Sequence, residues 1–141
     1  MISFVCGQLC SGKTLYSKSL AHTCSGLYIE VGDIVRSLKQ TEDRRLLQNS
    51  SHLAEQIIDY LKEKINSVSD KDLVVSGVRQ KEILEAFPSS TLLWIECPIK
   101  ERESRYKNRA REGDFQTFVD ADQGDINLGI LQVKQYIFNN I

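Results

Sequence analysis

The chain has 141 residues, of which 41% are hydrophobic and 26% are charged, and its formal net charge is −1. This composition is typical of a single globular domain, and the balanced charge argues against nucleic acid as a partner. The apolar runs are far shorter than a membrane span, and the chain does not open on a secretory signal pattern. We therefore expect one cytoplasmic domain over residues 1–141 with no membrane partner. The sequence leaves the oligomeric state open.

A phosphate-binding motif stands at the start of the chain. The apolar run 2–6 predicts a buried strand, and it leads into Gly7-Gln8-Leu9-Cys10-Ser11-Gly12-Lys13-Thr14, which has the pattern G-x-x-x-x-G-K-[ST]. Gly7 and Gly12 permit backbone conformations in which successive N–H groups turn towards an anion. Lys13 is expected to bind the β- and γ-phosphates, and Thr14 to bind Mg²⁺. The motif therefore predicts binding of a nucleoside triphosphate.

The rest of the chain alternates between helical and strand patterns. Within the first helix, Leu15, Tyr16 and Leu20 are expected to face the sheet. Wholly apolar strands that alternate with helices predict an α/β protein, a three-layer P-loop NTPase fold whose parallel five-stranded sheet is covered by helices on both faces. Besides the strand at 2–6, strands are expected over 27–31, 73–75, 91–97 and 136–138. Helices are expected over 13–21, 32–39, 53–65, 100–111 and 128–135. A further helix of about eight residues is expected after Gly77.

Cysteine and histidine usage argues against a zinc site and a disulfide framework. None of the four cysteines forms a C-x-x-C pair, and the chain has only two histidines. Small buried thiols in a reducing compartment explain this usage. Cys10 is different, because it lies inside the phosphate loop beside Lys13, and we hypothesise that it is sensitive to oxidants.

Two predicted strand ends carry residues suited to an acceptor site, because ligands of parallel sheets bind at the carboxyl edge. Asp33 and Arg36 follow the second strand at i, i+3 spacing; a carboxylate can orient or deprotonate an acceptor, and an arginine can bind its phosphate. Gly77 and Arg79 follow the third strand, where a substrate can approach the backbone and meet a cation. Plainer alternatives stay open: a capping aspartate beside an exposed arginine, and an ordinary strand-to-helix turn.

Four arginines occur in the predicted helix at 100–111. Arg102, Arg105 and Arg109 lie at i, i+3 and i+7 and share one face, whereas Arg111 points elsewhere. Like charges on one face repel each other, so this arrangement favours a shared anionic ligand, as phosphoryl transfer requires. The alternative is a solvated face on which nearby glutamates pair with the arginines.

These motifs together resemble the nucleoside-monophosphate-kinase-like branch of small P-loop kinases, with the closest likeness to adenylate-kinase-like and dephospho-coenzyme-A-kinase-like proteins. The resemblance covers nearly the whole chain, in order. Besides the phosphate loop, it rests on Gly32-Asp33-Ile34-Val35-Arg36, Val75-Ser76-Gly77-Val78-Arg79, Arg105-Tyr106-Lys107-Asn108-Arg109-Ala110-Arg111-Glu112-Gly113-Asp114 and Tyr136-Ile137-Phe138-Asn139-Asn140.

The resemblance implies ATP and Mg²⁺ as cofactors and a role for each matched residue. An acceptor-binding segment would span about 32–66 and a mobile lid about 99–124, and Asn139 would lie near the nucleotide base. Acceptor contacts would come from Asp33, Arg36, Gly77 and Arg79, and lid contacts to the transferring phosphoryl group from Arg105, Arg109 and Arg111. The catalytic residues would be Lys13, Asp33, Arg105 and Arg109.

One departure concerns the metal. The family has an aspartate at the end of the third strand, where this chain has Ser76. A serine hydroxyl can bind a metal-bound water but adds no negative charge. Either Glu30 or Asp33 compensates, or Mg²⁺ binds weakly and turnover is slow. The chain is also short for this family, so its acceptor-binding and lid segments must be minimal.

The expected function is transfer of the ATP γ-phosphoryl group to a small acceptor, a nucleoside or deoxynucleoside monophosphate. One alternative is phosphorylation of a hydroxyl group, as in dephospho-coenzyme A kinases, with Asp33 as the base. A second alternative is a regulator that binds nucleotide without catalysis. The change at Ser76 favours that reading, whereas Lys13, Thr14 and the lid arginines argue against it.

Overall fold

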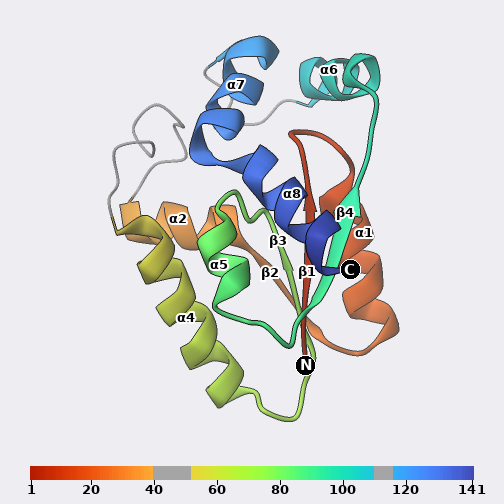
Figure 1. Ribbon diagram of the computed structural model, residues 1–141. Coiled ribbons are helices and arrows are strands. Elements are labelled where there is room, and N and C mark those ends of the chain that lie inside the picture. The colour runs from red at the N-terminus through yellow and green to blue at the C-terminus, as the bar shows by residue number, and fades with distance from the viewer. Residues whose placement is uncertain (40–51, 110–115) are drawn as a thin grey trace.

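The computed structural model describes residues 1–39, 52–109 and 116–141 (Figure 1). None of the helices in these ranges combines the length and the hydrophobicity that a membrane span requires. Parts of the expected acceptor-binding and lid segments fall in the two gaps. The described elements are β1 (Ile2–Gly7), α1 (Lys13–Thr23), β2 (Leu27–Glu30), α2 (Val31–Lys39), α4 (Leu53–Ser67), β3 (Leu73–Ser76), α5 (Lys81–Glu85), β4 (Thr91–Ile95), α6 (Ile99–Asn108), α7 (Phe118–Leu128) and α8 (Ile130–Asn140).

The sheet is parallel, with the strand order β2-β3-β1-β4. Phe4 of the central strand β1 pairs with Val75 of β3 on one side and with Leu92 of β4 on the other. Strands β1 and β3 consist almost entirely of buried residues, because helices cover both of their faces. Parallel pairing brings the carboxyl ends of all these strands to one edge, where the phosphate loop begins.

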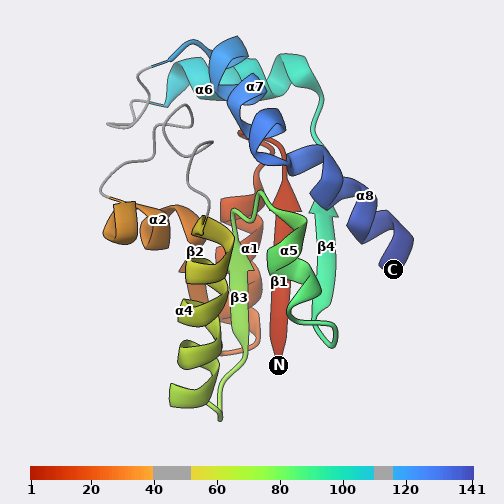
Figure 2. The same cartoon turned by 60° about the vertical axis from the view of Figure 1, so that its left-hand side comes forward.

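Helices cover both faces of the sheet, as the sequence predicts. Helices α4, α5 and α8 lie on one face and α1 lies on the other (Figures 1 and 2). The larger core cluster includes Phe4, Leu61 and Ile137, each fully buried. On the opposite face, Val5 and Val74 pack against Ala21 of α1. The three-layer α/β architecture is therefore confirmed.

Helices α6 and α7 lie beyond the carboxyl edge of the sheet, above the phosphate loop (Figures 1 and 2). They form a small apolar cluster of their own, in which Leu9 of the loop packs with Tyr106, Phe118 and Ala121. The rings of Tyr106 and Phe118 meet edge to face, with their centroids 5.8 Å apart. This cluster joins the expected lid region directly to the loop.

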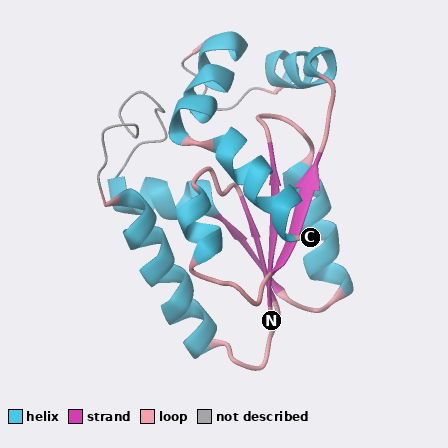
Figure 3. Cartoon of the chain, in the orientation of Figure 1, coloured by secondary structure: helices cyan, strands magenta, loops and turns pink. Residues whose placement is uncertain are grey.

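The predicted fifth strand is wrong. Residues 136–138 belong to helix α8, so the described sheet has four strands rather than five (Figure 3). Three residues at helical spacing, Ile130, Val133 and Ile137, are buried, whereas Phe138 is 53% exposed. The run Tyr-Ile-Phe has the β-propensity of a strand, but burial follows a helical period along the whole element. Asn139 consequently lies near the end of a helix.

The inward face of α1 also differs from the expectation. Leu15 and Tyr16 are exposed, whereas Leu20 packs against the core as expected, and the buried residues are Ser17 and Ala21. The Ser17 hydroxyl donates a hydrogen bond to the Lys13 carbonyl at 2.6 Å, so its burial leaves no polar group unpaired. Small side chains at the contact let the helix lie close to the sheet. The size of a side chain therefore decides which residues of α1 face the sheet more than its hydrophobicity does.

Candidate active site

The phosphate loop joins β1 to α1, and its glycines are required by the geometry. Cys10 and Gly12 have positive φ angles of 61° and 95°. A Cβ at Gly7 would lie 2.8 Å from the Ile95 carbonyl oxygen and closer still to the Ser11 hydroxyl. The N–H of Ser11 donates to the Gln8 carbonyl at 3.1 Å, which closes the turn. Helix α1 then begins at Lys13, with its N-terminal N–H groups at the loop.

A pocket of about 430 Å³ lies over this loop. Loop residues of its wall include Leu9, Cys10, Gly12 and Thr14, and the exposed Leu15 lies beside them. Five cationic side chains and one carboxylate line the same pocket: Lys13, Lys18, Arg79, Arg105, Arg109 and Glu30. This excess of positive charge suits a polyphosphate ligand.

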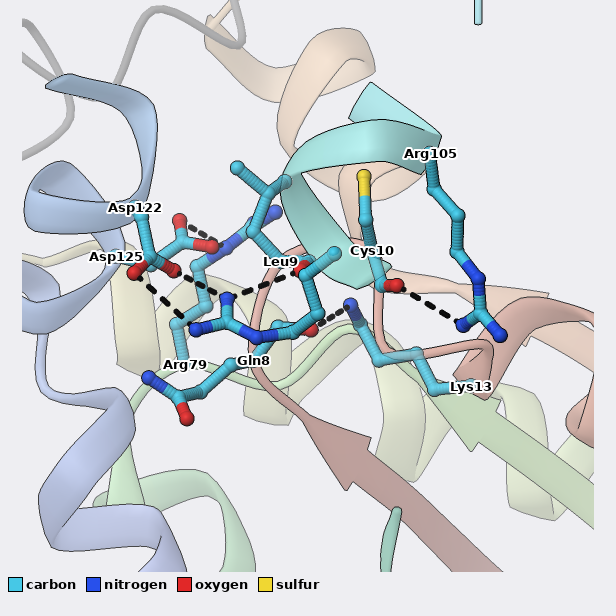
Figure 4. Close-up of polar contacts among 9 residues, drawn as sticks. Gln8, Leu9, Cys10, Lys13, Arg79, Arg105, Asp122 and Asp125 are labelled. Atoms are coloured by element: carbon cyan, nitrogen blue, oxygen red, sulfur yellow. Dashed lines mark hydrogen bonds and ion pairs between the residues drawn. The ribbon is translucent and has the colours of Figure 1, made fainter. Parts of the chain in front are cut away.

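Lys13 is held inside the loop. Its Nζ donates to the Gln8 carbonyl at 3.3 Å (Figure 4). Burial lowers the pKa of Lys13, and the nearby Arg79 guanidinium lowers it further, whereas Asp125 and Glu30 raise it. Desolvation makes the ammonium group costly in the absence of an anion, so a phosphate in the pocket would be strongly favoured.

Glu30 is the carboxylate of the pocket, and several donors fix it at the end of β2. The Tyr28 hydroxyl donates to Oε2 at 2.7 Å and the Ser76 hydroxyl donates to the same oxygen at 3.2 Å. The Gly32 N–H donates to Oε1 at 3.3 Å. Burial, followed by the negative charge of Glu30, raises the pKa of Tyr28 to about 12. Ser76 is fully buried, and its hydroxyl is hydrogen-bonded to Glu30.

Gly77 has a φ of 91°, and a Cβ at this position would collide with Oε1 of Glu30. The turn after β3 thus accepts only glycine without a shift of the Glu30 carboxylate. Glycine here serves the approach of a carboxylate from the neighbouring strand.

Asp33 and Arg36 are brought together, as their spacing predicts. They form an ion pair on α2, with 71% and 52% of their side chains exposed. Neither residue is part of the described wall of the phosphate pocket. Asp33 instead lines a neighbouring hollow along β2, which shares Glu30 with that pocket.

Arg79, which the resemblance assigns to the acceptor, lines the phosphate pocket and is also anchored from α7. Its Nε lies 2.8 Å from Oδ1 of Asp125, which is almost completely buried (Figure 4). Arg102 is likewise paired with a carboxylate of α7 and does not line the phosphate pocket. Its Nη1 donates to Asp122 at 2.8 Å and to the Leu9 carbonyl at 3.2 Å, and the side chain is buried.

Arg105 and Arg109 extend from the end of α6 into the pocket wall. Nη1 of Arg105 donates to the Cys10 carbonyl at 3.2 Å (Figure 4). Its Nη2 lies 3.9 Å from Oε2 of Glu101. The guanidinium of Arg109 lies 4.8 Å from the centre of the Tyr106 ring. The predicted face of three arginines is thus divided, because Arg102 turns inwards. Arg111 lies outside the described residues.

A family model described as "AAA domain" matches residues 4–123, which include the loop, nearly all of the sheet, α6 and the first half of α7. The chain belongs to this AAA-domain family. No curated protein sequence matches it.

Solved structures show the same fold as this AAA-domain chain. A shikimate kinase from Acinetobacter baumannii is 13% identical with a TM-score of 0.62, and the match covers 98% of this chain and 78% of that one. A sugar kinase from a Janibacter species is 17% identical with a TM-score of 0.61 and coverage of 88% and 76%. A shikimate kinase from Aquifex aeolicus is 15% identical with a TM-score of 0.54 and coverage of 91% and 79%. The family and these neighbours show a small P-loop kinase-like fold.

Sequence reasoning missed several side chains of this AAA-domain site. The sequence pattern did not predict α7, whose buried carboxylates Asp122 and Asp125 hold two arginines. The i, i+3 spacing of these two acids, next to Phe118 and Ala121, is the sequence feature that indicates a helix with one buried face here. Lys18 was also missed, although it lies one helical turn after Thr14.

A divalent cation fits the pocket only in combination with phosphate oxygens. Thr14 and Glu30 line the same pocket and offer a hydroxyl and a carboxylate. In the described ranges, no group of three His, Cys, Asp or Glu residues could hold a metal ion. Mg²⁺ suits such a site, because it commonly takes one or two protein ligands together with waters and substrate phosphates.

Proposed function

We propose that this AAA-domain chain transfers the γ-phosphoryl group of ATP to a nucleoside or deoxynucleoside monophosphate. The observation that carries the proposal is the convergence of five cations on a phosphate loop at the carboxyl edge of the sheet. The charge excess supports a polyphosphate donor, and Arg105 and Arg109 approach from α6 rather than from the loop itself. Cations that reach a phosphate from a second side suit a transferring group.

Each pocket residue has a defined task in this proposal. Lys13 and the N–H groups at the start of α1 would bind the β- and γ-phosphates. Arg105 and Arg109 would stabilise the charge that spreads over the transferring oxygens. Mg²⁺, when bound, neutralises charge on the β- and γ-phosphates. Thr14 and Glu30 would hold that ion, with Glu30 in place of the carboxylate that Ser76 lacks, because Asp33 is exposed and paired with Arg36.

The acceptor would enter beside α2 and the turn after β3. Arg79 would bind its phosphate from the pocket wall, and Arg36 would join it after exchanging its contact with Asp33 for the ligand. Asp33 would orient the acceptor. The proposed acceptor thus engages a cation from each of two elements, which favours a monophosphate over a neutral molecule.

Phosphorylation of a hydroxyl group is the second candidate. Two of the solved structures of this fold are kinases for shikimate and for a sugar, which are hydroxyl compounds rather than nucleotides. In that reaction Asp33 would accept the proton of the attacking hydroxyl. Asp33→Asn separates the candidates: turnover should fall about a hundredfold or more with a hydroxyl acceptor, and by about tenfold or less with a monophosphate.

The proposal is tested by ADP release in a coupled assay with ATP and Mg²⁺. The acceptors are nucleoside and deoxynucleoside monophosphates, dephospho-coenzyme A, shikimate and simple sugars. ADP release should depend on one acceptor class and disappear in Lys13→Ala. Lys71→Ala, which changes an exposed lysine in the loop before β3, is the matched control and should behave as wild type.

The same assay distinguishes an enzyme from a nucleotide-binding regulator. Arg105→Ala should reduce turnover by about a hundredfold or more, with ATP affinity changed much less. If ATP binds but no acceptor raises ADP release above background, the kinase proposal fails and the regulator reading takes its place.

A further inference from the structure

Helix α7 buries two carboxylates where a helix normally buries apolar side chains. Asp122 and Asp125 are 8% and 2% exposed and lie one turn apart, beside the buried Phe118 and Ala121. A buried charge is costly unless it is paired and hydrogen-bonded, and apolar residues would stabilise a helix contact at least as well. The two acids therefore call for an explanation beyond attachment of the helix.

Asp122 is connected to the backbone of the phosphate loop. Its carboxylate accepts from Nη1 of Arg102 at 2.8 Å, and the same nitrogen donates to the Leu9 carbonyl at 3.2 Å. The Arg102 guanidinium also lies 5.4 Å from the centre of the Phe118 ring, which restricts its motion. A single guanidinium thus joins α7, α6 and the loop.

Asp125 is connected to the wall of the phosphate pocket. It lies 2.8 Å from Nε of Arg79, whose side chain is 21% exposed and lines the pocket beside Lys13. The Asp125 carboxylate is close enough to Lys13 to raise the pKa of that lysine. Both acids of α7 therefore end at the same pocket, one through the loop and one through a pocket cation (Figure 4).

We propose that Asp122 and Asp125 are positioning residues of the phosphate site. Asp122 holds Arg102 against the Leu9 carbonyl and keeps the loop in its phosphate-receiving conformation. Asp125 orients Arg79 in the pocket. The role of Asp125 rests on the proposed function, because it acts only when a phosphate occupies the pocket, whereas the loop contact of Asp122 exists without ligand.

The direction of the change in anion affinity distinguishes a positioning role of Asp125 from a purely electrostatic one. Loss of a carboxylate beside a cationic pocket should, by charge alone, strengthen the binding of an anion. Loss of a positioned arginine should weaken it. Asp125→Asn keeps the size of the side chain and removes the charge, so the direction of the change in affinity decides between the two roles.

The experiment compares wild type with Asp122→Asn, Asp125→Asn and Asp120→Asn. Asp120 is an exposed acid in the first turn of α7 and provides the matched control. Hydrogen exchange of residues 8–14 is measured without ligand, with a peptide of α8 as the reference for global opening. Binding of ATP and of inorganic tripolyphosphate is measured by calorimetry in the presence of Mg²⁺.

We expect Asp122→Asn to accelerate exchange in the loop about fivefold or more while α8 stays near the wild-type rate. Asp125→Asn should weaken both anions about tenfold, and Asp120→Asn should leave every readout unchanged. Wild-type exchange in the loop, or equal acceleration in α8, overturns the role of Asp122. Unchanged or stronger anion binding overturns that of Asp125. If Asp122→Asn does not fold, Asp122→Glu takes its place with the same expectations, because its longer side chain displaces the carboxylate.

If wild type binds neither anion, the proposed function and the role of Asp125 fail together. The exchange of the loop then still decides the role of Asp122.

Discussion

At the scale of single residues, the pocket holds two partly buried groups of opposite charge, Lys13 and Glu30. Lys13 is a cation in a desolvated place, and Glu30 is an anion held by three donors. The pair Thr14 and Lys13 followed from the motif, since its spacing defines each role. The sequence named Glu30 only as one of two acids that could compensate for Ser76, because the hydrogen bonds from Tyr28 and Ser76 depend on the pairing of β2 with β3.

The lowered pKa of Lys13 predicts how ATP affinity changes with pH. A bound triphosphate favours the charged ammonium, so affinity should be highest while Lys13 is protonated and fall as pH rises through its lowered pKa towards 10.5. Lys13→Arg keeps its charge over this range, so its affinity should stay level. Calorimetric titrations between pH 7.5 and 10 measure both, and a level profile in wild type would contradict the assignment.

Thiol labelling tests the position of Cys10. Cys10 lines the pocket and Cys24 is exposed, whereas Cys6 and Cys97 are buried. Burial raises the pKa of Cys6 to about 12, so its thiol should stay unreactive. Native alkylation should therefore modify Cys10 and Cys24, and ATP should protect Cys10 alone, as mass spectrometry of peptides would show. Equal protection of Cys24, or no protection of Cys10, speaks against a nucleotide over the loop.

At the scale of elements, α6 and α7 turn a bare phosphate loop into an enclosed site. Apolar contacts of Leu9 with Tyr106 and Phe118 join them to the loop, and the buried ion pair of Asp122 with Arg102 reinforces the contact. Hydrophobic periodicity predicts helices and strands that pack against a sheet, and it worked for β1 to β4. It did not predict α7, because part of the buried face of this helix is charged.

Two substitutions test the burial pattern of α8, the helix that stands where the sequence predicted a fifth strand. Ile137 is fully buried and Phe138 is 53% exposed, although both belong to the run that suggested a strand. Ile137→Ala should lower the free energy of unfolding by about 2–4 kcal/mol, and Phe138→Ala by about 0.5 kcal/mol, in urea denaturation. A larger loss for Phe138 than for Ile137 would contradict the burial pattern of α8.

At the scale of the whole molecule, the parallel sheet brings distant parts of the chain to one edge. The loop after β1, the turn after β3 and the helix after β4 each supply cations to a single pocket. The order of motifs predicted this convergence, since carboxyl ends of parallel strands meet. Local spacing could not predict which arginines face the pocket. Arg102 turns inwards because Asp122, twenty residues later in the chain, lies within reach.

The most direct test of the account is a transfer assay with ATP labelled at its γ-phosphate. Wild type, ATP and Mg²⁺ are incubated with each acceptor, and the products are separated. We predict that the label moves to a nucleoside or deoxynucleoside monophosphate in wild type and Lys71→Ala but remains on ATP in Lys13→Ala. Label that stays on ATP with every acceptor, or is released only as inorganic phosphate, would contradict a kinase.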